Sequence, residues 1–193
     1  MDEPGVGRSV RAALFRLADL LEAESAVYMI VGALAVAVWG RPRATADIDV
    51  TLQADAGHLE MLASRAERVG FVVDREWLEW QPLLRDRQRR LTTPGAIVDL
   101  MRPRDAHEEA ALGRRREVAF ERRRLPFVAP DDLVLMKLKA GRPRDFEDAV
   151  SVLAAQGGAL DTAYLWDWAS RLGVGAELDY VFRATGDSST GAP

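Results

Sequence analysis

The chain has 193 residues, of which 48% are hydrophobic and 29% are charged, and its formal net charge is -4. A chain of this length is expected to form one domain, or one domain with a small helical addition. It has no cysteine, which excludes disulfides, thiolate metal sites and thiol catalysis. Its two histidines, His58 and His107, are too few for a histidine zinc site, so any metal should be held by oxygen, as Mg²⁺ or Mn²⁺ are.

The most apolar run, residues 26–39, is too short to cross a membrane. Its 14 residues fall short of the roughly 20 that a spanning helix needs, and Gly32 interrupts it. The N-terminus is acidic and lacks the charged-then-apolar order of a signal peptide. We therefore expect a cytoplasmic protein without a membrane partner.

Positive charge is concentrated between residues 85 and 124, where twelve arginines stand against seven acidic residues. Two explanations are open. The arginines either form salt bridges on helix faces, or they make an electropositive rim for a phosphate-bearing substrate such as RNA. The overall acidity of the chain does not support the second explanation.

The first half of the chain alternates between predicted helices and strands. Residues 10–24 have the apolar spacing of an amphipathic helix, residues 26–31 form a buried strand that ends at Gly32, and residues 33–39 form a short helix. Residues 47–52 alternate between apolar and polar types, which predicts a half-buried strand. Its apolar side carries Ile48, Val50 and Leu52, and its polar side carries Asp47, Asp49 and Thr51.

The second half begins with a predicted helix over residues 57–69 and strands over 71–73, 96–101 and 122–128, while residues 77–84 have no clear pattern. Helices are expected over 131–140, 144–155 and 161–172. The order predicts an α+β fold, a small mixed β-sheet flanked by helices. We divide it into a core of residues 1–128, a helical C-terminal part of residues 129–184 and a disordered tail of residues 185–193.

The tripeptide Asp47-Ile48-Asp49 is the strongest candidate for chemistry. On a strand, residues two apart project from one face about 7 Å apart. Two such carboxylates can jointly bind divalent ions held ~3.5–4 Å apart. The tripeptide is common by itself, but Gly32 stands upstream between a strand and a helix, where backbone N–H groups can meet a phosphate. The two features together predict a metal and phosphate site.

Several stretches of this sequence resemble one family. Residues 30–35, Ile-Val-Gly-Ala-Leu-Ala, and residues 40–50, Gly-Arg-Pro-Arg-Ala-Thr-Ala-Asp-Ile-Asp-Val, are similar to the signature of nucleotidyltransferases of the DNA polymerase β superfamily. Residues 130–137 and 141–148 are similar to the same proteins, so the resemblance covers roughly residues 26–155. The chain most resembles the small bacterial AbiEii-type toxins of toxin–antitoxin systems.

The resemblance implies a nucleotidyltransferase fold and a reaction that depends on Mg²⁺ or Mn²⁺. A nucleoside monophosphate would pass from an NTP, such as ATP, to an acceptor hydroxyl. The acceptor implied by the toxins is tRNA or a protein, with an antitoxin as a partner. Two other readings stay open: modification of a small molecule such as an aminoglycoside-like antibiotic, and a fold that binds a nucleotide or a partner without turnover.

The resemblance also implies roles for individual residues. Asp47 and Asp49 would hold the metal, and Gly32 with the helix it opens would cradle the triphosphate. Lys137 would contact phosphate, and Asp145 would act near the nucleotide or the attacking group. The chain departs from the family pattern at Ala33, which keeps a backbone donor for the nucleotide but removes any hydroxyl.

Asp99 lies on the predicted strand 96–101, which could neighbour the strand that carries Asp47 and Asp49. It either completes the metal site as a third ligand, accepts the proton of the attacking hydroxyl, or faces solvent. Arg43 and Thr45 either bind the nucleotide's phosphates, orient Asp47, or shape the loop.

Asp145 and Asp148 lie three residues apart at the start of a predicted helix. They either face one cleft, where both would serve the nucleotide, or complement the helix dipole. Lys137 and Lys139 are the only lysines of the chain, which favours a compact charge on phosphate at Lys137. Four tryptophans are expected in the core and not as stacking platforms: Trp77, Trp80, Trp166 and Trp168.

Overall fold

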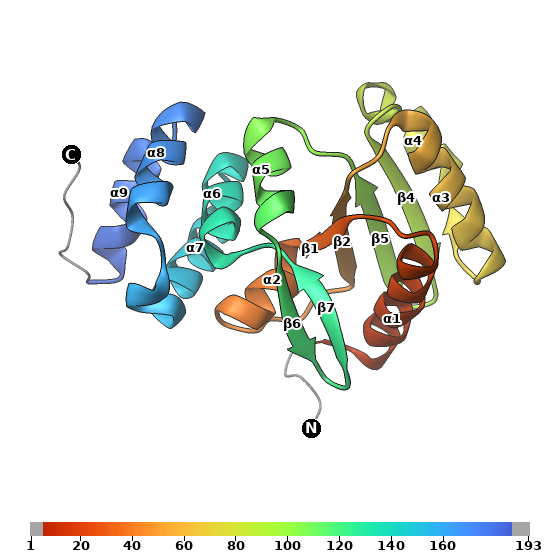
Figure 1. The fold of residues 1–193 in the computed structure, drawn as a ribbon, viewed down its shortest axis with the longest axis horizontal. Helices are drawn as coiled ribbons and strands as arrows, with labels where there is room; N and C mark the ends of the chain where they lie inside the picture. The colour runs from red at the N-terminus through yellow and green to blue at the C-terminus, as the bar shows by residue number, and fades with distance from the viewer. Residues whose placement is uncertain (1–5, 187–193) are drawn as a thin grey trace.

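The computed structural model describes residues 6–186, which form a mixed seven-stranded sheet with helices around it (Figure 1). The strand order is β3-β4-β5-β2-β1-β7-β6. The strands are β1 (Tyr28–Val31), β2 (Asp47–Leu52), β3 (Val72–Val73), β4 (Gln88–Thr93), β5 (Ala96–Met101), β6 (Arg116–Phe120) and β7 (Arg123–Phe127). The helices are α1 (Arg8–Ala23), α2 (Gly32–Trp39), α3 (Ala56–Arg68), α4 (Arg75–Glu79), α5 (Ala106–Arg114), α6 (Pro130–Ala140), α7 (Pro143–Gln156), α8 (Thr162–Leu172) and α9 (Gly175–Ala184), with 3-10 turns η1 (Pro82–Leu84) and η2 (Gly157–Ala159). The predicted α+β fold is confirmed.

The centre of the sheet is buried as its sequence pattern predicts. All four residues of β1 are buried, and on β2 the apolar residues Ile48, Val50 and Leu52 are completely buried. Helix α1 contributes the stripe of alanines and leucines that the periodicity indicated, among them Leu14, Leu17 and Leu21. Burial of such side chains stabilises the fold by roughly 1.5–3 kcal/mol each.

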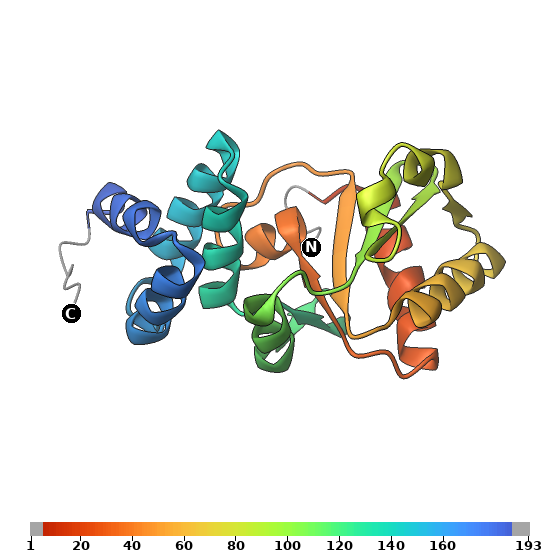
Figure 2. The ribbon, with the colours of Figure 1, turned by 90° about the horizontal axis from the view of Figure 1, so that it is seen from above.

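The helices are divided between the two ends of the molecule. Helices α1 and α3 lie at the end formed by β3, β4 and β5, and α6 to α9 gather at the other (Figure 1). In the perpendicular view, α6 and α7 stand between α2 and the last two helices, α8 and α9 (Figure 2). The C-terminal helices therefore reach the sheet through α2, whose N-terminus adjoins β1.

Five helices and strands were not predicted: α4, β4, α5, β6 and α9. Residues 88–93 are polar at most positions and become a strand because they pair on both sides, with β3 and with β5. Strand β6 is similarly polar, and within residues 6–186 its one strand partner is β7, with which it forms a hairpin. In both cases, long-range pairing decides the structure where local hydrophobic patterning is weak.

The prediction that all four tryptophans lie in the core is wrong for Trp80, which is 78% exposed, and for Trp77, which is half-buried outside the core cluster. Trp80 caps the short helix α4, which has no fully buried residue. Trp166 and Trp168 are partly buried and pack against the core, as expected.

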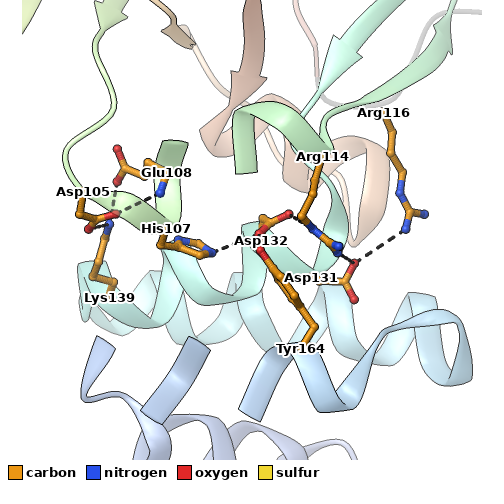
Figure 3. A network of polar contacts seen from close by, with 9 residues as sticks. All are labelled: Asp105, His107, Glu108, Arg114, Arg116, Asp131, Asp132, Lys139 and Tyr164. Carbon is orange, nitrogen blue, oxygen red and sulfur yellow. Dashed lines mark hydrogen bonds and ion pairs between the residues drawn. The ribbon is translucent and has the colours of Figure 1, made fainter. Parts of the chain in front are cut away.

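A buried polar network joins the helical C-terminal part to the rest of the chain (Figure 3). Its centre is Asp132 on α6, which is fully buried. One of its oxygens accepts the Tyr164 hydroxyl at 2.6 Å and lies 3.1 Å from Nε2 of His107, and the other accepts Nε of Arg114 at 3.1 Å. These partners belong to α5 and α8, so one carboxylate ties three helices together.

A second group in the same view holds the start of α5 against the end of α6 (Figure 3). Nζ of Lys139 donates to Asp105 at 2.6 Å and to Glu108 at 2.7 Å. Asp105 also caps α5 by accepting the backbone N–H of Glu108 at 3.0 Å. Lys139 is therefore a structural residue.

The division at residue 128 into a core and a helical part stays a prediction. Of the tail predicted for residues 185–193, residues 187–193 lie outside the described residues. Between residues 6 and 186, no helix is both long and apolar enough to cross a membrane.

Candidate active site

Three neighbouring strands bring three charged side chains into one row. Strands β2 and β5 are parallel, and Asp49 pairs in register with Asp99. Strand β4 is antiparallel to β5, and Arg90 pairs with Asp99. Residues paired in register lie on the same face of a sheet, with neighbouring strands about 4.8 Å apart. The predicted neighbourhood of the strands that carry Asp49 and Asp99 is therefore correct.

Gly32 lies against Asp49, and a side chain at this position would be strained and would displace Asp49. Val31 pairs with Asp49 across β1 and β2, so Gly32 follows directly after the paired position. Its φ is +66°, and a Cβ atom there would lie 2.0 Å from Oδ2 of Asp49. The absence of a side chain lets the first turn of α2, with its unpaired backbone N–H groups, approach the carboxylate closely.

Asp49 is surrounded by charge of its own sign. Burial and the carboxylates of Asp99 and Asp47 raise its pKa from the ordinary 3.8 to about 6, although Lys137 and Arg142 act in the opposite direction. A group that holds its proton so tightly marks a place where negative charge is crowded and a cation would be favoured.

Thr45 fixes the chain where it enters β2. Its hydroxyl accepts the backbone N–H of Asp47 at 3.0 Å. Of the three roles open for Thr45, this hydrogen bond favours orienting Asp47. The Asp47 side chain itself is exposed and lines the cleft described below.

The wall opposite the strands comes from α6 and α7, where Lys137 is buried between two carboxylates. Its Nζ donates to Oδ1 of Asp145 at 3.0 Å and to Oδ2 of Asp148 at 2.8 Å. Arg43 also donates two hydrogen bonds to Asp148, both at 3.2 Å. Asp148 thus links the loop before β2 to α6 and α7.

Arg142 completes this wall. Its Nε donates to Oδ2 of Asp145 at 2.6 Å. Burial acts to raise the pKa of Asp145, but the hydrogen bonds from Arg142 and Lys137 outweigh it and hold that pKa below the ordinary value. Asp145 therefore stays ionised and acts as the anchor of two cations.

These groups surround a cleft of about 570 Å³. It collects nine of the ten residues proposed for the site, and Asp148 is the exception because it is not among the lining residues. The lining residues are Gly32, Ala33, Arg43, Thr45, Asp47, Asp49, Arg90, Ile97, Asp99, Lys137, Arg142, Arg144 and Asp145. The roles assigned to these residues stay predictions.

Three cations of the cleft were not predicted: Arg90, Arg142 and Arg144. Arg142 and Arg144 belong to the second of two Gly-Arg-Pro-Arg sequences, at residues 40–43 and 141–144. Arg43 of the first copy contacts Asp148 on α7, and the second copy lies at the start of α7 and supplies Arg142 and Arg144 to the cleft. The repeated motif was therefore a usable signal, whereas Arg90 could not be found without β4.

The donors at this cleft suit a hard divalent cation. Asp47 and Asp49 offer only carboxylate oxygens, the ligands that Mg²⁺ and Mn²⁺ prefer. Within residues 6–186, no three histidine, aspartate or glutamate side chains converge closely enough to hold a metal ion. In the described structure, the oxygens of Asp99 are bound by Arg90 instead.

Another cavity, of about 910 Å³, shares no lining residue with the cleft. It is bordered by the other face of α7, by Gly40 and Arg41, and by Tyr180 on α9. It contains no cluster of acidic side chains.

The arginines of residues 85–124 are mostly bound within the protein. Only Arg90 lines the cleft. Ion pairs or carbonyl contacts engage Arg89, Arg102, Arg104, Arg114, Arg116, Arg123 and Arg124. The salt-bridge explanation of this charge excess is therefore the better one.

No protein-family model and no curated protein sequence matches this chain. Solved structures do. The lincosamide antibiotic adenylyltransferase LnuA, lincomycin-bound, matches with a TM-score of 0.53 and 18% identity over 77% of this chain and 97% of that chain. ANT(2")-Ia in complex with adenylyl-2"-tobramycin matches with a TM-score of 0.59 and 14% identity over 86% and 99%.

A third match is an antigenic nucleotidyltransferase-like protein from Paracoccidioides brasiliensis, with a TM-score of 0.54 and 16% identity over 91% of this chain and 92% of that one. At such identities the likeness shows the fold alone. The chain has the fold of nucleotidyltransferases, as the resemblance implied, while a special closeness to the AbiEii-type toxins stays a prediction.

Proposed function

We propose that this chain is a metal-dependent nucleotidyltransferase that moves a nucleoside monophosphate from an NTP to an acceptor hydroxyl. The observation that carries the proposal is the contact between Gly32 and Asp49, which places the N-terminus of a helix beside a carboxylate pair. A helix N-terminus attracts phosphate, and a carboxylate pair attracts the cation that accompanies phosphate. The fold supports the same reaction class.

In the proposed reaction, the acceptor oxygen attacks the α-phosphorus of the NTP. The bond from that phosphorus to the bridging oxygen breaks, pyrophosphate leaves, and the hydroxyl proton passes to Asp99. Mg²⁺ or Mn²⁺ held by Asp47 and Asp49 would neutralise phosphate charge there. The remaining work of the chain is to position the reactants.

The triphosphate is assigned to the space between α2 and the wall formed by α6 and α7. The backbone N–H groups of Gly32 and Ala33 offer donors that need no hydroxyl. An ammonium group has three N–H donors. Lys137 donates one hydrogen bond to Asp145 and one to Asp148, which leaves one donor for phosphate. Arg144 lines the cleft, and among the described residues it has no hydrogen-bond or ion-pair partner.

The acceptor is a finer proposal with two candidates. The toxin resemblance favours tRNA or a protein, with an antitoxin as partner. The likeness to two antibiotic adenylyltransferases favours a small molecule. A cationic antibiotic would call for an acidic pocket, and the cavity of about 910 Å³ is lined by one acidic residue, Glu147, and one basic residue, Arg41. We therefore keep tRNA or protein as the first candidate.

A fold that binds a nucleotide without turnover is the non-enzymatic alternative, and Ala33 is the departure that favours it. Calorimetric titration of each NTP with and without Mg²⁺ separates the two. We expect one NTP to bind at least about tenfold more tightly with Mg²⁺ than without it, and Asp49→Asn to remove this difference. An NTP affinity that is changed neither by Mg²⁺ nor by Asp49→Asn would contradict the proposed function.

A further inference from the structure

Arg90 is held by two partners at the rim of the cleft. Its Nε donates to Oδ1 of Asp99 at 2.9 Å and its Nη2 donates to Oδ2 at 2.8 Å, so the guanidinium grips both carboxylate oxygens. The same guanidinium lies over the ring of Trp77, 4.2 Å from the centroid. The fork geometry makes this ion pair strong and specific in orientation.

The position of Trp77 is set by the backbone of Arg90 itself. The backbone N–H of Asp74 donates to the carbonyl oxygen of Arg90 at 2.9 Å. The Asp74 carboxylate then caps α4 by accepting the N–H of Trp77 at 2.9 Å. Helix α4 therefore begins at a point fixed by β4, beside which it lies (Figure 1). Strand β4, the Asp74 cap and the ring of Trp77 together orient the guanidinium of Arg90.

This arrangement ties the Asp99 carboxylate to β4, on the other side of β5 from Asp49. Strand β5 lies between β4 and β2, so Arg90 and Asp49 stand on opposite sides of Asp99. Hydrogen bonds to Arg90 direct the carboxylate towards β4. For Asp99 to join Asp47 and Asp49 around one cation, its carboxylate would have to turn towards β2, whereas both hydrogen bonds to Arg90 hold it on the side of β4.

Asp99 still has capacity for another partner. An ionised carboxylate has about four lone-pair sites, and the fork of Arg90 uses two of them. The Asp99 side chain is 13% exposed and that of Arg90 is 26% exposed, and both line the cleft. A hydroxyl group arriving from the cleft can therefore reach Asp99 without displacing Arg90.

We propose that Arg90 is a positioning residue that keeps Asp99 out of the metal site and reserves it for the acceptor hydroxyl. Trp77 supports Arg90 in this role. The metal is then held by Asp47 and Asp49 alone, and the acceptor approaches from the side of β4 and α4. This inference rests on the proposed function, because it divides the roles within the same site.

The test measures binding of Mn²⁺ alone to the nucleotide-free protein, by calorimetry and by electron paramagnetic resonance of the free ion. Arg90→Gln should raise the Mn²⁺ affinity about tenfold, because it releases Asp99 as an additional ligand. Loss of any nearby positive charge also raises the affinity. Arg144→Gln is the matched control, since Arg144 lines the same cleft; its gain should stay below about threefold because an exposed charge is screened.

Two further variants test whether a gain in Mn²⁺ affinity comes from the release of Asp99, and not from the loss of a positive charge or from misfolding. The charge-balanced double variant Arg90→Gln/Asp99→Asn should fall back to within about threefold of the natural protein, since released Asp99 is the source of the gain. Trp77→Leu removes the support of Arg90 without changing charge, and it should raise the affinity in the same direction. Trp80→Leu, at a tryptophan that is 78% exposed, should leave the affinity unchanged.

Equal gains in Arg90→Gln and Arg144→Gln, or a lower affinity in Arg90→Gln, would overturn the inference. So would a loss beyond about tenfold in the double variant, because Asp99 would then already be a ligand. Failure of the proposed function looks different: Asp49→Asn would bind Mn²⁺ as well as the natural protein does. If Asp49→Asn lowers the Mn²⁺ affinity but Arg90→Gln leaves it unchanged, only the inference is overturned and the proposed function stands.

Discussion

Gly32 and Asp49 share one space: a Cβ atom on Gly32 would lie 2.0 Å from Oδ2 of Asp49. The contact joins the start of α2 to β2, the strand that carries Asp47 and Asp49. The part of the proposed site that would bind phosphate therefore directly contacts the part that would bind the metal. Any side chain on Gly32 must move Asp49, and with it the cation site.

Gly32→Ala should therefore cost both stability and ligand binding. An alanine at φ +66° is strained by about 1–2 kcal/mol, and the clash with Asp49 adds to this. Gly173→Ala is the matched control, because Gly173 has φ +71° and a Cβ atom there would meet nothing within 4 Å. Urea denaturation should show a larger loss for Gly32→Ala, which alone should weaken metal-dependent NTP binding. Equal effects of the two substitutions would refute the close contact.

Asp49→Asn should stabilise the metal-free protein at neutral pH. The folded-state pKa of about 6 lies above the ordinary 3.8, so folding favours protonated Asp49 and stability falls as the pH rises through this interval. The charged group then costs about 1–3 kcal/mol above pH 6, at about 1.4 kcal/mol per pKa unit.

Thermal unfolding in a chelator, measured from pH 4 to pH 8, checks this. The advantage of Asp49→Asn should be largest above pH 6 and vanish near pH 4. Asp47→Asn, at an exposed position of the same strand, serves as the comparison and should change stability little. A constant advantage at every pH would show that something other than the charge of Asp49 is responsible.

Asp148→Asn should weaken NTP binding although Asp148 does not line the cleft. Its carboxylate orients Lys137 and Arg43, which do. We expect a loss of about five- to tenfold in affinity, in the range of other supporting residues. Glu147→Gln is the control, because the neighbouring Glu147 faces the other cavity. Matching losses in both variants would point to a general effect of negative charge on α7.

Asp132→Asn should destabilise the whole chain by about 2–4 kcal/mol, because it removes one partner from a buried charged network. Tyr164→Phe removes a single hydrogen bond of that network and should cost about 1 kcal/mol. Asp167→Asn breaks an exposed pair with Arg171 and should cost less than about 1 kcal/mol.

Urea unfolding followed by tryptophan fluorescence and by circular dichroism tests the same network for cooperativity. If Asp132 joins the C-terminal helices to the core as Figure 3 indicates, the two probes should report one transition in the natural protein. Two separate transitions would show that the helical part unfolds independently.

Local patterns predicted the parts of the site that are built locally. Alternation placed Asp47 and Asp49 on one face of β2, and the glycine between a strand and a helix marked Gly32. Both depend on residues close together in the chain. Asp99 was identified as a candidate because the apolar residues of its strand made the strand recognisable in the sequence. Its register with Asp49 is known only from the structure.

The parts that escaped prediction depend on distant pairing. Arg90 meets Asp99 only through the β4–β5 hairpin, and β4 has no strong apolar pattern of its own. The ion pairs of Arg43 and Lys137 with Asp148 span 105 and 11 residues of the chain. In the sequence these residues are marked only by their charge, and the charge of a residue does not identify its ion-pair partner. Binding to phosphate was one of the roles open for Arg43; in the structure its guanidinium donates to Asp148 on α7 and also lines the cleft.

The central claim is that Asp47 and Asp49 carry out nucleotidyl transfer, and one measurement tests it most directly. The protein is incubated with each α-labelled NTP, Mg²⁺ and, in separate reactions, total tRNA, cell lysate protein or an aminoglycoside, beside Asp49→Asn. The account predicts that label from one NTP becomes covalently attached to one acceptor, with release of unlabelled pyrophosphate, only when Mg²⁺ and Asp49 are present. Equal labelling by Asp49→Asn, or by the natural protein in a chelator, would contradict it.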